Sequence, residues 1–203
     1  MDTKLDGLLK KIKQLENDLL VEIRVKELEF RYEVRRRKVH FTAAATAQHR
    51  KLAKQIHRYL IDARFLSLLT TPIIWSCIVP IVLLDLWAAV YQFICFPAYG
   101  IPKVRRGDYI VIDRQKLAYL NPIEKFNCVY CGYVNGLIAL VQEIAGRTEQ
   151  YWCPIKHALR LKAMHSRYPH FLDYGDAEAY RQRIEQVRRD FDDLQPPKAP
   201  PHS

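Results

Sequence analysis

The sequence predicts a mainly α-helical membrane protein. We expect an N-terminal helix with a small β-hairpin, an apolar helical hairpin and a C-terminal helical module clamped by a metal. Three observations predict this class. The 203-residue chain has a net charge of +10, although 49% of its residues are hydrophobic. Basic and apolar residues fall in separate segments, and three of the five cysteines lie close together near a histidine.

The separation of charge from apolar residues predicts contact with a membrane. Residues 24–64 contain twelve Lys or Arg and four Asp or Glu, whereas residues 65–102 contain only one charge, Asp85. Lys and Arg gather on the cytoplasmic side of membrane spans and meet anionic lipid there. Nucleic-acid binding is a competing explanation of the charge, but no RNP-type aromatic motif, zinc-finger spacing or basic zipper supports it. We therefore expect membrane lipid, not nucleic acid, as a partner.

Residues 1–60 form the predicted cytoplasmic basic region. Residues 4–28 show a helical pattern, with charged residues between apolar ones spaced three and four apart. Such a stripe fits a coiled coil with a protein partner or a second copy of the chain, and it equally fits a helix that folds back on its own chain. The stripe comprises Leu5, Leu8, Ile12, Leu15, Leu19 and Ile23.

A β-hairpin is predicted next, over residues 30–41. Phe30, Tyr32 and Val34 alternate with polar residues, and Val39 and Phe41 resume the alternation after the sequence RRRK. A period of two around a short polar turn is typical of a hairpin. The turn lacks Gly and Asn, so continuation of the helix is the alternative. Residues 42–65 are then rich in good helix formers.

Residues 61–102 are predicted to form a membrane hairpin. One membrane-spanning helix needs about 20 apolar residues, and the uncharged run is too long for one ordinary span. Pro80 lies near its middle and is expected to break or kink the helix. Both flanks are basic, so the positive-inside rule places both termini in the cytoplasm. The alternatives are one span over residues 72–96 with an interfacial flank, and a buried helical pair of a soluble protein.

Asp85 lies within the apolar run. An intramembrane carboxylate is costly and suggests a functional site, such as one for transport or lipid handling. The simpler explanation, which we prefer, places Asp85 near the hairpin turn, where it is hydrated or bonded to backbone donors freed by Pro80.

The predicted cytoplasmic Cys/His module covers residues 103–194. The sequence DYIVIDR alternates like a short strand, and NGLIALVQEIAGR has an amphipathic helical pattern over residues 135–147. Asp176 is a candidate N-cap for a later helix of about four turns. The Pro-rich tail, residues 195–203, is predicted to be disordered.

The cysteine pattern predicts a metal site. The candidate ligands Cys128, Cys131, Cys153 and His157 follow the spacing C-x2-C, 21 residues, C-x3-H. Cys153 precedes Pro154, a residue favoured at the first helical position, so Cys153 is expected near a helix N-terminus with His157 one turn later. Three Cys and one His form a known type of structural zinc site.

Several alternatives to this zinc site remain open. Iron is a possible substitute, because a thiolate-rich site binds either metal. Cys128 and Cys131 fit a dithiol–disulfide pair, and unliganded buried thiols are a third interpretation. His165 is a less well placed fourth ligand than His157. Glu149 is a candidate carboxylate for holding a ligand histidine in one tautomer, or a solvated residue.

Three stretches carry a resemblance to a family of bacterial membrane proteins. They are residues 79–114, residues 127–158, which contain the motif CxxC followed by WCPIKH, and the sequence FLDYGDAEAY. The likeness covers residues 29–180 and is weakest at both ends. It implies a protein of the bacterial inner membrane. The family is uncharacterised in activity, so the resemblance implies no substrate and no ligand set.

The function expected from these features is that of a membrane-anchored scaffold or adaptor with structural zinc in its cytoplasmic module. No Gly-rich phosphate loop, nucleophile elbow or open three-ligand metal pattern indicates an enzyme. A membrane-tethered redox carrier, using iron or a dithiol, is the first alternative. A transport or lipid-handling component that uses Asp85 is the second.

Overall fold

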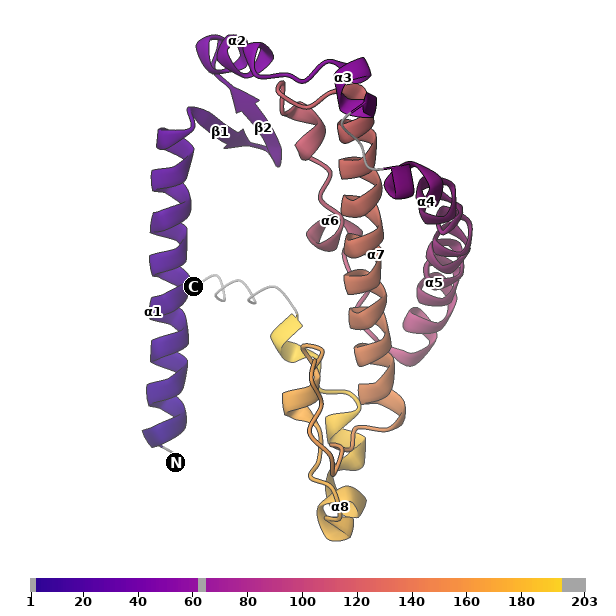
Figure 1. Ribbon diagram of the computed structural model, residues 1–203. Coiled ribbons are helices and arrows are strands. Elements are labelled where there is room, and N and C mark those ends of the chain that lie inside the picture. Colours follow the sequence, from indigo (N-terminus) through magenta and orange to yellow (C-terminus); the bar gives the residue numbers. More distant parts are fainter. Residues whose placement is uncertain (1–2, 62–64, 195–203) are drawn as a thin grey trace. The chain divides into compact units, whose positions relative to one another are not determined.

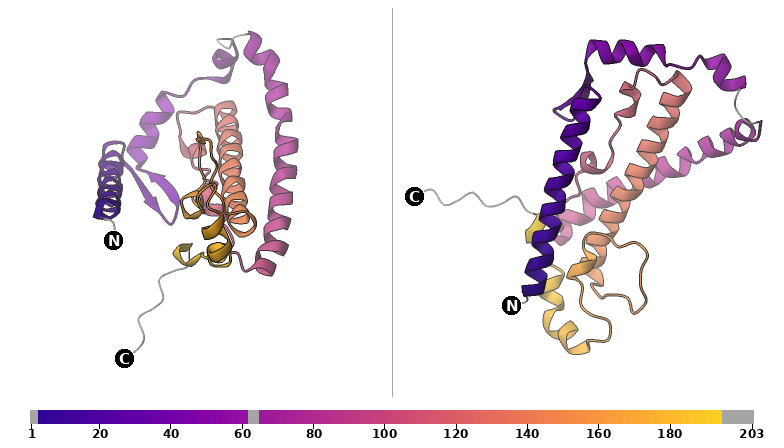
Figure 2. Two further views of the ribbon diagram at one scale, coloured as in Figure 1. Left: turned by 90° about the horizontal axis from the view of Figure 1, so that it is seen from below. Right: turned by 60° about the vertical axis from the view of Figure 1, so that its left-hand side comes forward.

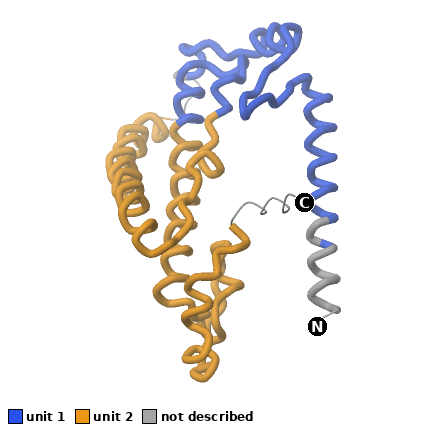
Figure 3. The backbone as a smooth tube through the Cα atoms, turned by 180° about the vertical axis from the view of Figure 1, so that it is seen from behind, with its two compact units in different colours: residues 1–63, 113–129 blue, residues 64–112, 130–203 orange. Residues whose placement is uncertain are grey.

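The computed structural model describes residues 3–61 and 65–194, apart from the side chains of residues 3–10, 12, 13 and 60. The chain divides into two compact units (Figures 1 and 3). Unit 1 comprises residues 1–63 and 113–129, and unit 2 comprises residues 64–112 and 130–203. Helices dominate both units, which confirms the predicted mainly helical class. The predicted disordered tail at residues 195–203 lies outside the described residues.

Unit 1 begins with the long helix α1 (Thr3–Glu29) and the predicted β-hairpin. Strands β1 (Tyr32–Arg35) and β2 (Lys38–Phe41) pair antiparallel, with Tyr32 opposite Phe41. Arg36 and Arg37 form the two-residue turn, and both have positive φ angles, 48° and 62°. That geometry is the one that matches the twist of a hairpin, although Asn and Gly adopt it more readily than Arg.

The rest of unit 1 consists of short elements, and aromatic rings make many of its contacts. Helix α2 (Ala43–Lys51) follows Thr42, whose side chain accepts a hydrogen bond from the Ala45 amide at 3.3 Å. His49 contacts the rings of Phe41 and Tyr119 edge to face. Helix α3 (Ile56–Ile61) and the 3-10 turn η1 (Arg114–Lys116) complete the unit, together with the start of α7.

Helix α7 (Pro122–Trp152) is longer than the sequence pattern predicted. Asn121 and Glu124 form a capping box, in which each side chain accepts a hydrogen bond from the other residue's amide, at 3.0 and 2.8 Å. Pro122 occupies the first helical position, where its missing amide costs nothing. The helix then continues without interruption through the C-x2-C sequence. Cys128 and Cys131, the first two predicted metal ligands, therefore belong to one regular helix and not to a turn.

The apolar run does not fold back at Pro80 as predicted. Helices α4 (Phe65–Ser76) and α5 (Ile78–Tyr99) are separated only by Cys77, which itself has near-helical angles of −61° and −14°. Pro80 lacks the amide that would bond to the Ser76 carbonyl, so the helix is interrupted there without a reversal. The two helices follow one bent course (Figure 2). α5 ends at Gly100, whose φ of 68° is the left-handed cap that favours glycine.

The chain reverses after Gly100 and lies along α7. We call residues 101–112 the return segment; it contains the short helix α6 (Arg106–Tyr109). The Arg147 side chain donates a hydrogen bond to the Pro102 carbonyl at 2.7 Å. Gln92 of α5 bonds to both backbone polar groups of Val104. The predicted strand DYIVIDR is absent from this segment, which is fixed by side chains instead of a sheet.

Unit 2 ends with a long loop and helix α8 (Ala177–Val187). The loop contains the 3-10 turn η2 (Tyr168–His170), and η3 (Asp192–Leu194) follows α8. The Asp176 side chain caps α8 by accepting from the Ala179 amide at 2.9 Å, which confirms the predicted N-cap. One core joins α5, the return segment, α7 and the end of α8. Its buried members are Ala88, Phe96, Ile101, Val104, Leu137, Leu140, Ile144 and Phe191.

Two helical stretches are long and apolar enough to cross a membrane: Phe65–Tyr99 and Pro122–Trp152. None of the most apolar window of the first stretch is buried, against 28% for the second. These features support membrane association on length and composition.

We expect Gly136→Ala to destabilise the protein although Ala is the better helix former. A Cβ at Gly136 would lie 2.7 Å from the Tyr109 carbonyl oxygen and 2.8 Å from the Ile110 Cα. Moving this backbone should cost about 1–3 kcal/mol, more than the ~1 kcal/mol gained in helix propensity. Thermal unfolding followed by circular dichroism measures the difference. Gly132→Ala is the control, because its nearest neighbour is the Val111 oxygen at 3.3 Å; equal stability of the two variants would contradict the packing.

Candidate functional site

The predicted metal ligands lie at different ends of a helix. Cys128 and Cys131 stand three positions apart on α7, so they lie about one turn from each other. Cys153 comes directly after the end of α7, and its amide bonds to the Glu149 carbonyl at 2.7 Å. Cys131 and Cys153 are exposed, and all five cysteines of the chain are free.

The sequence WCPIKH ends a helix, whereas the pattern predicted that it begins one. After Cys153 the chain forms a short parallel bridge between Ile155 and Leu172, and these backbone bonds replace helical ones. Cys153 therefore lies at the C-terminal end of α7, and not at a helix N-terminus as predicted. The His157 ring stacks on Tyr168, with centroids 6.2 Å apart.

The four residues are not brought together. Cys131 and Trp152 are separated by 21 helical steps, or about 32 Å at 1.5 Å per residue. Zinc ligands must all lie within about 2.3 Å of one ion. Among the described residues, no group of three or more His, Cys, Asp and Glu could hold a metal. Zinc, and iron in its place, stay predictions that this arrangement does not support.

Asp85 is paired with residues to which no pattern in the sequence connects it. Arg106 of the return segment donates both terminal nitrogens to the two carboxylate oxygens, one of them at 2.6 Å. The Tyr133 hydroxyl of α7 donates to Oδ2 at 2.6 Å. Asp85 therefore lies in a fork-to-fork ion pair with a third donor, and not beside a hairpin turn. The pair neutralises the one charge of the apolar run.

Arg167 is the most deeply buried charged residue described, with its side chain 1% exposed. It donates to the Gln150 side chain at 2.5 Å, the Asp193 carboxylate at 2.6 Å and the Asp190 carbonyl at 2.9 Å. The guanidinium also lies over the Phe191 ring. Since a buried charge is tolerated only when it is paired and hydrogen-bonded, this network fixes the loop and the end of α8 to α7.

A second polar group lies on the buried side of α7. Glu143 accepts from Arg147 at 2.9 Å and from the Ser166 hydroxyl at 2.6 Å. His165 bonds to Glu149 at 3.0 Å and accepts from the Arg167 amide through Nδ1 at 3.2 Å. Both ring nitrogens of His165 are thus occupied by protein groups. This leaves no free nitrogen for the metal-ligand role considered for His165, and Glu149 orients His165 rather than His157.

One pattern in the sequence indicates this network. Glu143, Arg147 and Gln150 recur at the helical spacing of the apolar residues Leu140 and Ile144, so they lie on the side of α7 that faces the core. Polar residues on a core-facing stripe must find buried partners. Arg106, Tyr133 and Arg167 carry no comparable signal, because each becomes significant only through a distant contact.

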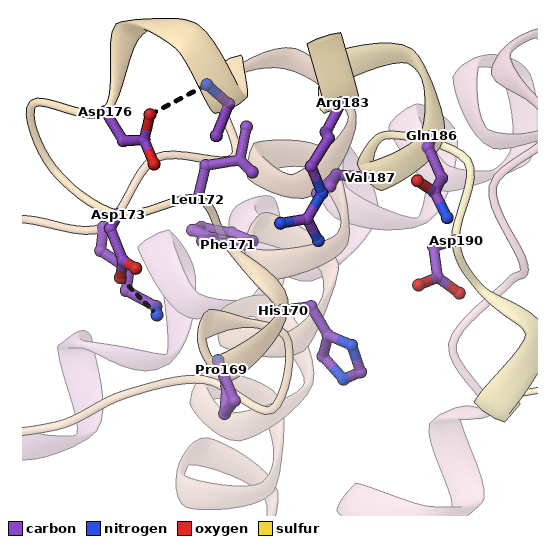
Figure 4. Close-up of a pocket in the computed structure, with 12 residues that line it drawn as sticks. Pro169, His170, Phe171, Leu172, Asp173, Asp176, Arg183, Gln186, Val187 and Asp190 are labelled. Atoms are coloured by element: carbon purple, nitrogen blue, oxygen red, sulfur yellow. Dashed lines mark hydrogen bonds and ion pairs between the residues drawn. The ribbon is translucent and has the colours of Figure 1, made fainter. Parts of the chain in front are cut away.

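A cleft of about 340 Å³ lies between α8 and residues 169–173 (Figure 4). Phe171, Leu172 and Val187 contribute buried apolar surface to its wall. Arg183 extends from α8 into this space, with His170 on the opposite side (Figure 4). No hydrogen bond or ion pair of the Arg183 side chain is found among the described residues, whereas Lys156 is paired with Asp173 at 2.8 Å. The cleft therefore combines the Arg183 guanidinium and buried apolar surface with the carboxylates of Asp173, Asp176 and Asp190.

We expect Asp193→Asn to lower the melting temperature at neutral pH. The difference in melting temperature from wild type should become smaller as the pH falls from 5 towards 2. Burial alone would raise the pKa of Asp193, but the hydrogen bond and charge of Arg167, aided by His170, hold the pKa below its ordinary value. A lowered pKa means that the ion pair stabilises the fold above about pH 4, and that this contribution disappears as pH falls through the folded-state pKa.

The loss should be modest, on the order of 1 kcal/mol, because the Asp193 side chain is 46% exposed. Thermal unfolding of wild type and variant at several pH values measures it. Asp192→Asn, one residue earlier, is the matched control for the general effect of removing a negative charge. An equal shift in both variants, or a shift of Asp193→Asn that does not depend on pH, would contradict the Arg167–Asp193 pair.

The chain was compared with protein-family models, with curated proteins and with solved structures, and nothing matched. The sites described above therefore rest on the geometry of the described residues and on general chemistry. The resemblance to a bacterial membrane protein family likewise stays a prediction.

Proposed function

We propose that the protein is a membrane-attached scaffold or adaptor. The observation that carries the proposal is the uncovered apolar surface of α4 and α5. Large side chains along both helices are exposed on nearly every turn. The exposed set includes Phe65, Leu66, Leu69, Ile73, Val79, Leu83, Leu86, Trp87, Phe93 and Ile94.

The free energy of burying apolar side chains favours lipid as the neighbour of this surface. Burying one large apolar side chain is worth about 1.5–3 kcal/mol, and the set contains ten. A soluble protein rarely leaves so large a contiguous apolar surface in water, and such surfaces mark membrane or partner contacts. The basic residues that flank the run along the chain add attraction to anionic headgroups. We therefore assign the surface to membrane lipid.

Two features favour an adaptor over a simple anchor. The cleft beside α8 offers Arg183 to an anionic group of a partner. On α1, the described members of the predicted stripe, Leu15, Leu19 and Ile23, are all exposed, as expected for a helix that pairs with a protein partner or a second copy. Leu5, Leu8 and Ile12 lie outside the described side chains.

The adaptor accounts for the sites better than the two alternatives. A transport role needs a carboxylate that is free to bind, but Asp85 is engaged by Arg106 and Tyr133. A redox role needs a metal cluster or an activated thiol pair, and Cys128 and Cys131 lie within a regular helix instead of at its N-terminus. The adaptor proposal does not depend on zinc.

We expect the triple variant Leu83→Gln, Trp87→Gln, Phe93→Gln to bind membranes at least 100-fold more weakly. Each substitution removes about 1.5 kcal/mol or more of lipid contact, and the combined loss exceeds 4 kcal/mol. Flotation of purified protein with vesicles of phosphatidylglycerol and phosphatidylethanolamine measures partitioning. The far-ultraviolet circular dichroism spectrum should not change, because these side chains are exposed and not part of the core.

The matched control is Leu159→Gln with Met164→Gln, which removes exposed apolar residues from the loop of the same unit. This variant should float like wild type. The membrane assignment would be refuted by wild-type protein that remains with the soluble fraction. It would also be refuted if the loop variant and the helix variant lost binding equally.

For the cleft, we expect acetate or inorganic phosphate to shift the NMR resonance of the Arg183 side-chain Nε–H in a saturable manner. Arg183→Gln should abolish saturable shifts of the other residues that line the cleft, such as His170. Arg181→Gln, on the same helix but outside the cleft, should leave them unchanged. Linear shifts without saturation, equal in both variants, would mean that the cleft holds no anion site.

A further inference from the structure

The α4–α5 pair and the second half of α7 run in the same direction, although they lie side by side. The Tyr130 hydroxyl donates to the Ile74 carbonyl at 2.7 Å. Further along both helices, the Tyr91 hydroxyl shares a hydrogen bond of 3.0 Å with Thr148. The order of contacts is the same on both, which requires a parallel arrangement. The chain must therefore travel back between the end of α5 and the start of α7 (Figures 1 and 2).

The return segment runs back along the surface of α7. Its contacts occur in reverse order: Pro102 bonds to Arg147, Tyr109 meets Gly136, and Val111 meets Gly132. If α5 crossed a bilayer with this packing intact, the return segment would lie at the same depth. That segment is mostly irregular, and irregular backbone within a bilayer is tolerated only where protein covers it.

The charged side chains of the return segment are not covered by protein. Arg105 is 84% exposed, and Arg106 remains half exposed although it pairs with Asp85. A charged side chain at bilayer depth costs about 2.5–3.5 kcal/mol even on the most lenient scale. The charged residues of the segment are Lys103, Arg105, Arg106 and Asp108.

The length of the apolar helix also argues against a helix that crosses the membrane. Phe65–Tyr99 has 35 residues, or about 52 Å, whereas the hydrocarbon core is about 30 Å thick. Fitting the whole length would need a tilt of about 55°, beyond the 0–40° range of membrane helices. α5 alone, about 33 Å for 22 residues, would fit, but it would carry the Asp85–Arg106 pair about 10 Å into the bilayer.

We infer that the protein is attached to one face of the membrane without crossing it. α4 and α5 lie in the membrane surface, and their outward side chains enter the lipid. The side of α5 that faces α7 stays towards water with the return segment. The two sides alternate at helical spacing: Leu83, Leu86, Val90 and Phe93 point outward and exposed, whereas Ala88 and Phe96 are buried in the core. Helices that lie in the interface bury their apolar side by about 5–10 Å in this manner.

This inference rests on the proposed membrane attachment, and its test separates the two. In a variant whose five native cysteines are replaced by serine, Lys103→Cys and Lys51→Cys each supply one exposed thiol, on opposite sides of the apolar run. The full-length variants are expressed in bacterial cells and treated with a membrane-impermeant maleimide. We expect neither site to react in intact spheroplasts and both to react after permeabilisation, since both face the cytoplasm.

Labelling of only one of the two sites in intact spheroplasts would show that the chain crosses the membrane, and the inference would fail while the attachment stands. Protein that does not sediment with the membrane fraction would overturn both. A variant that keeps the fold is recognised by its unchanged melting temperature in detergent relative to wild type. Lys162→Cys, in the exposed loop of unit 2, is a third site and should react in the same way as Lys103→Cys.

Discussion

The unbroken course of helix α7 is the constraint on which the described sites depend. A capping box fixes where it begins, and no proline occurs between Pro122 and Pro154. Because the helix continues without interruption from Cys128 to Trp152, it keeps Cys131 about 32 Å from the end that precedes Cys153. The return segment packs along the same surface of α7, where Gly132 and Gly136 permit close approach of its backbone. One helix thus separates the predicted ligands and gathers the polar contacts of unit 2.

Charged side chains inside unit 2 are paired with residues of opposite charge instead of being kept out of its interior. Asp85, Glu143 and Arg167 would each be costly to bury alone, yet each meets a partner of opposite charge. A buried pair of this kind stabilises little compared with an apolar core, but loss of one partner leaves an uncompensated charge. These pairs therefore act mainly to specify how the return segment and the loop attach to α7. They explain how a chain with irregular segments holds one arrangement.

Local patterns predicted the elements of the fold well and their connections poorly. The alternation around residues 30–41, the Asp176 cap and the helical periodicities are short-range signals, and the structure contains the corresponding hairpin and helices. Pro80 was misleading because its effect depends on position: in the first turn of α5 it interrupts a helix without reversing it. The C-x2-C spacing was misleading because it is equally compatible with a regular helix. Neighbouring residues in the sequence decide neither whether the chain reverses at Pro80 nor whether the C-x2-C residues form a turn.

The candidate site was harder to predict, because its partners are distant along the chain. Asp85 finds Arg106 only after the chain has turned at Gly100 and run back. Arg167 finds Asp193 across the whole of α8. Glu143 and Arg147, on the core-facing stripe of α7, were the exception, since their spacing alone indicated buried polar partners. Contacts of high sequence separation need the three-dimensional course of the chain, and one sequence supplies only its local preferences.

The same core links the proposed membrane surface to the proposed partner cleft. Phe96 of α5 and Phe191, four residues beyond α8, belong to one buried cluster with Leu137 and Ile144 of α7. α5 carries the surface assigned to lipid, and α8 carries Arg183. Since well-packed interiors transmit displacement instead of absorbing it, the two elements are held in a fixed relation within unit 2. A scaffold requires this property, because a partner held at α8 is then kept at a defined position relative to the membrane.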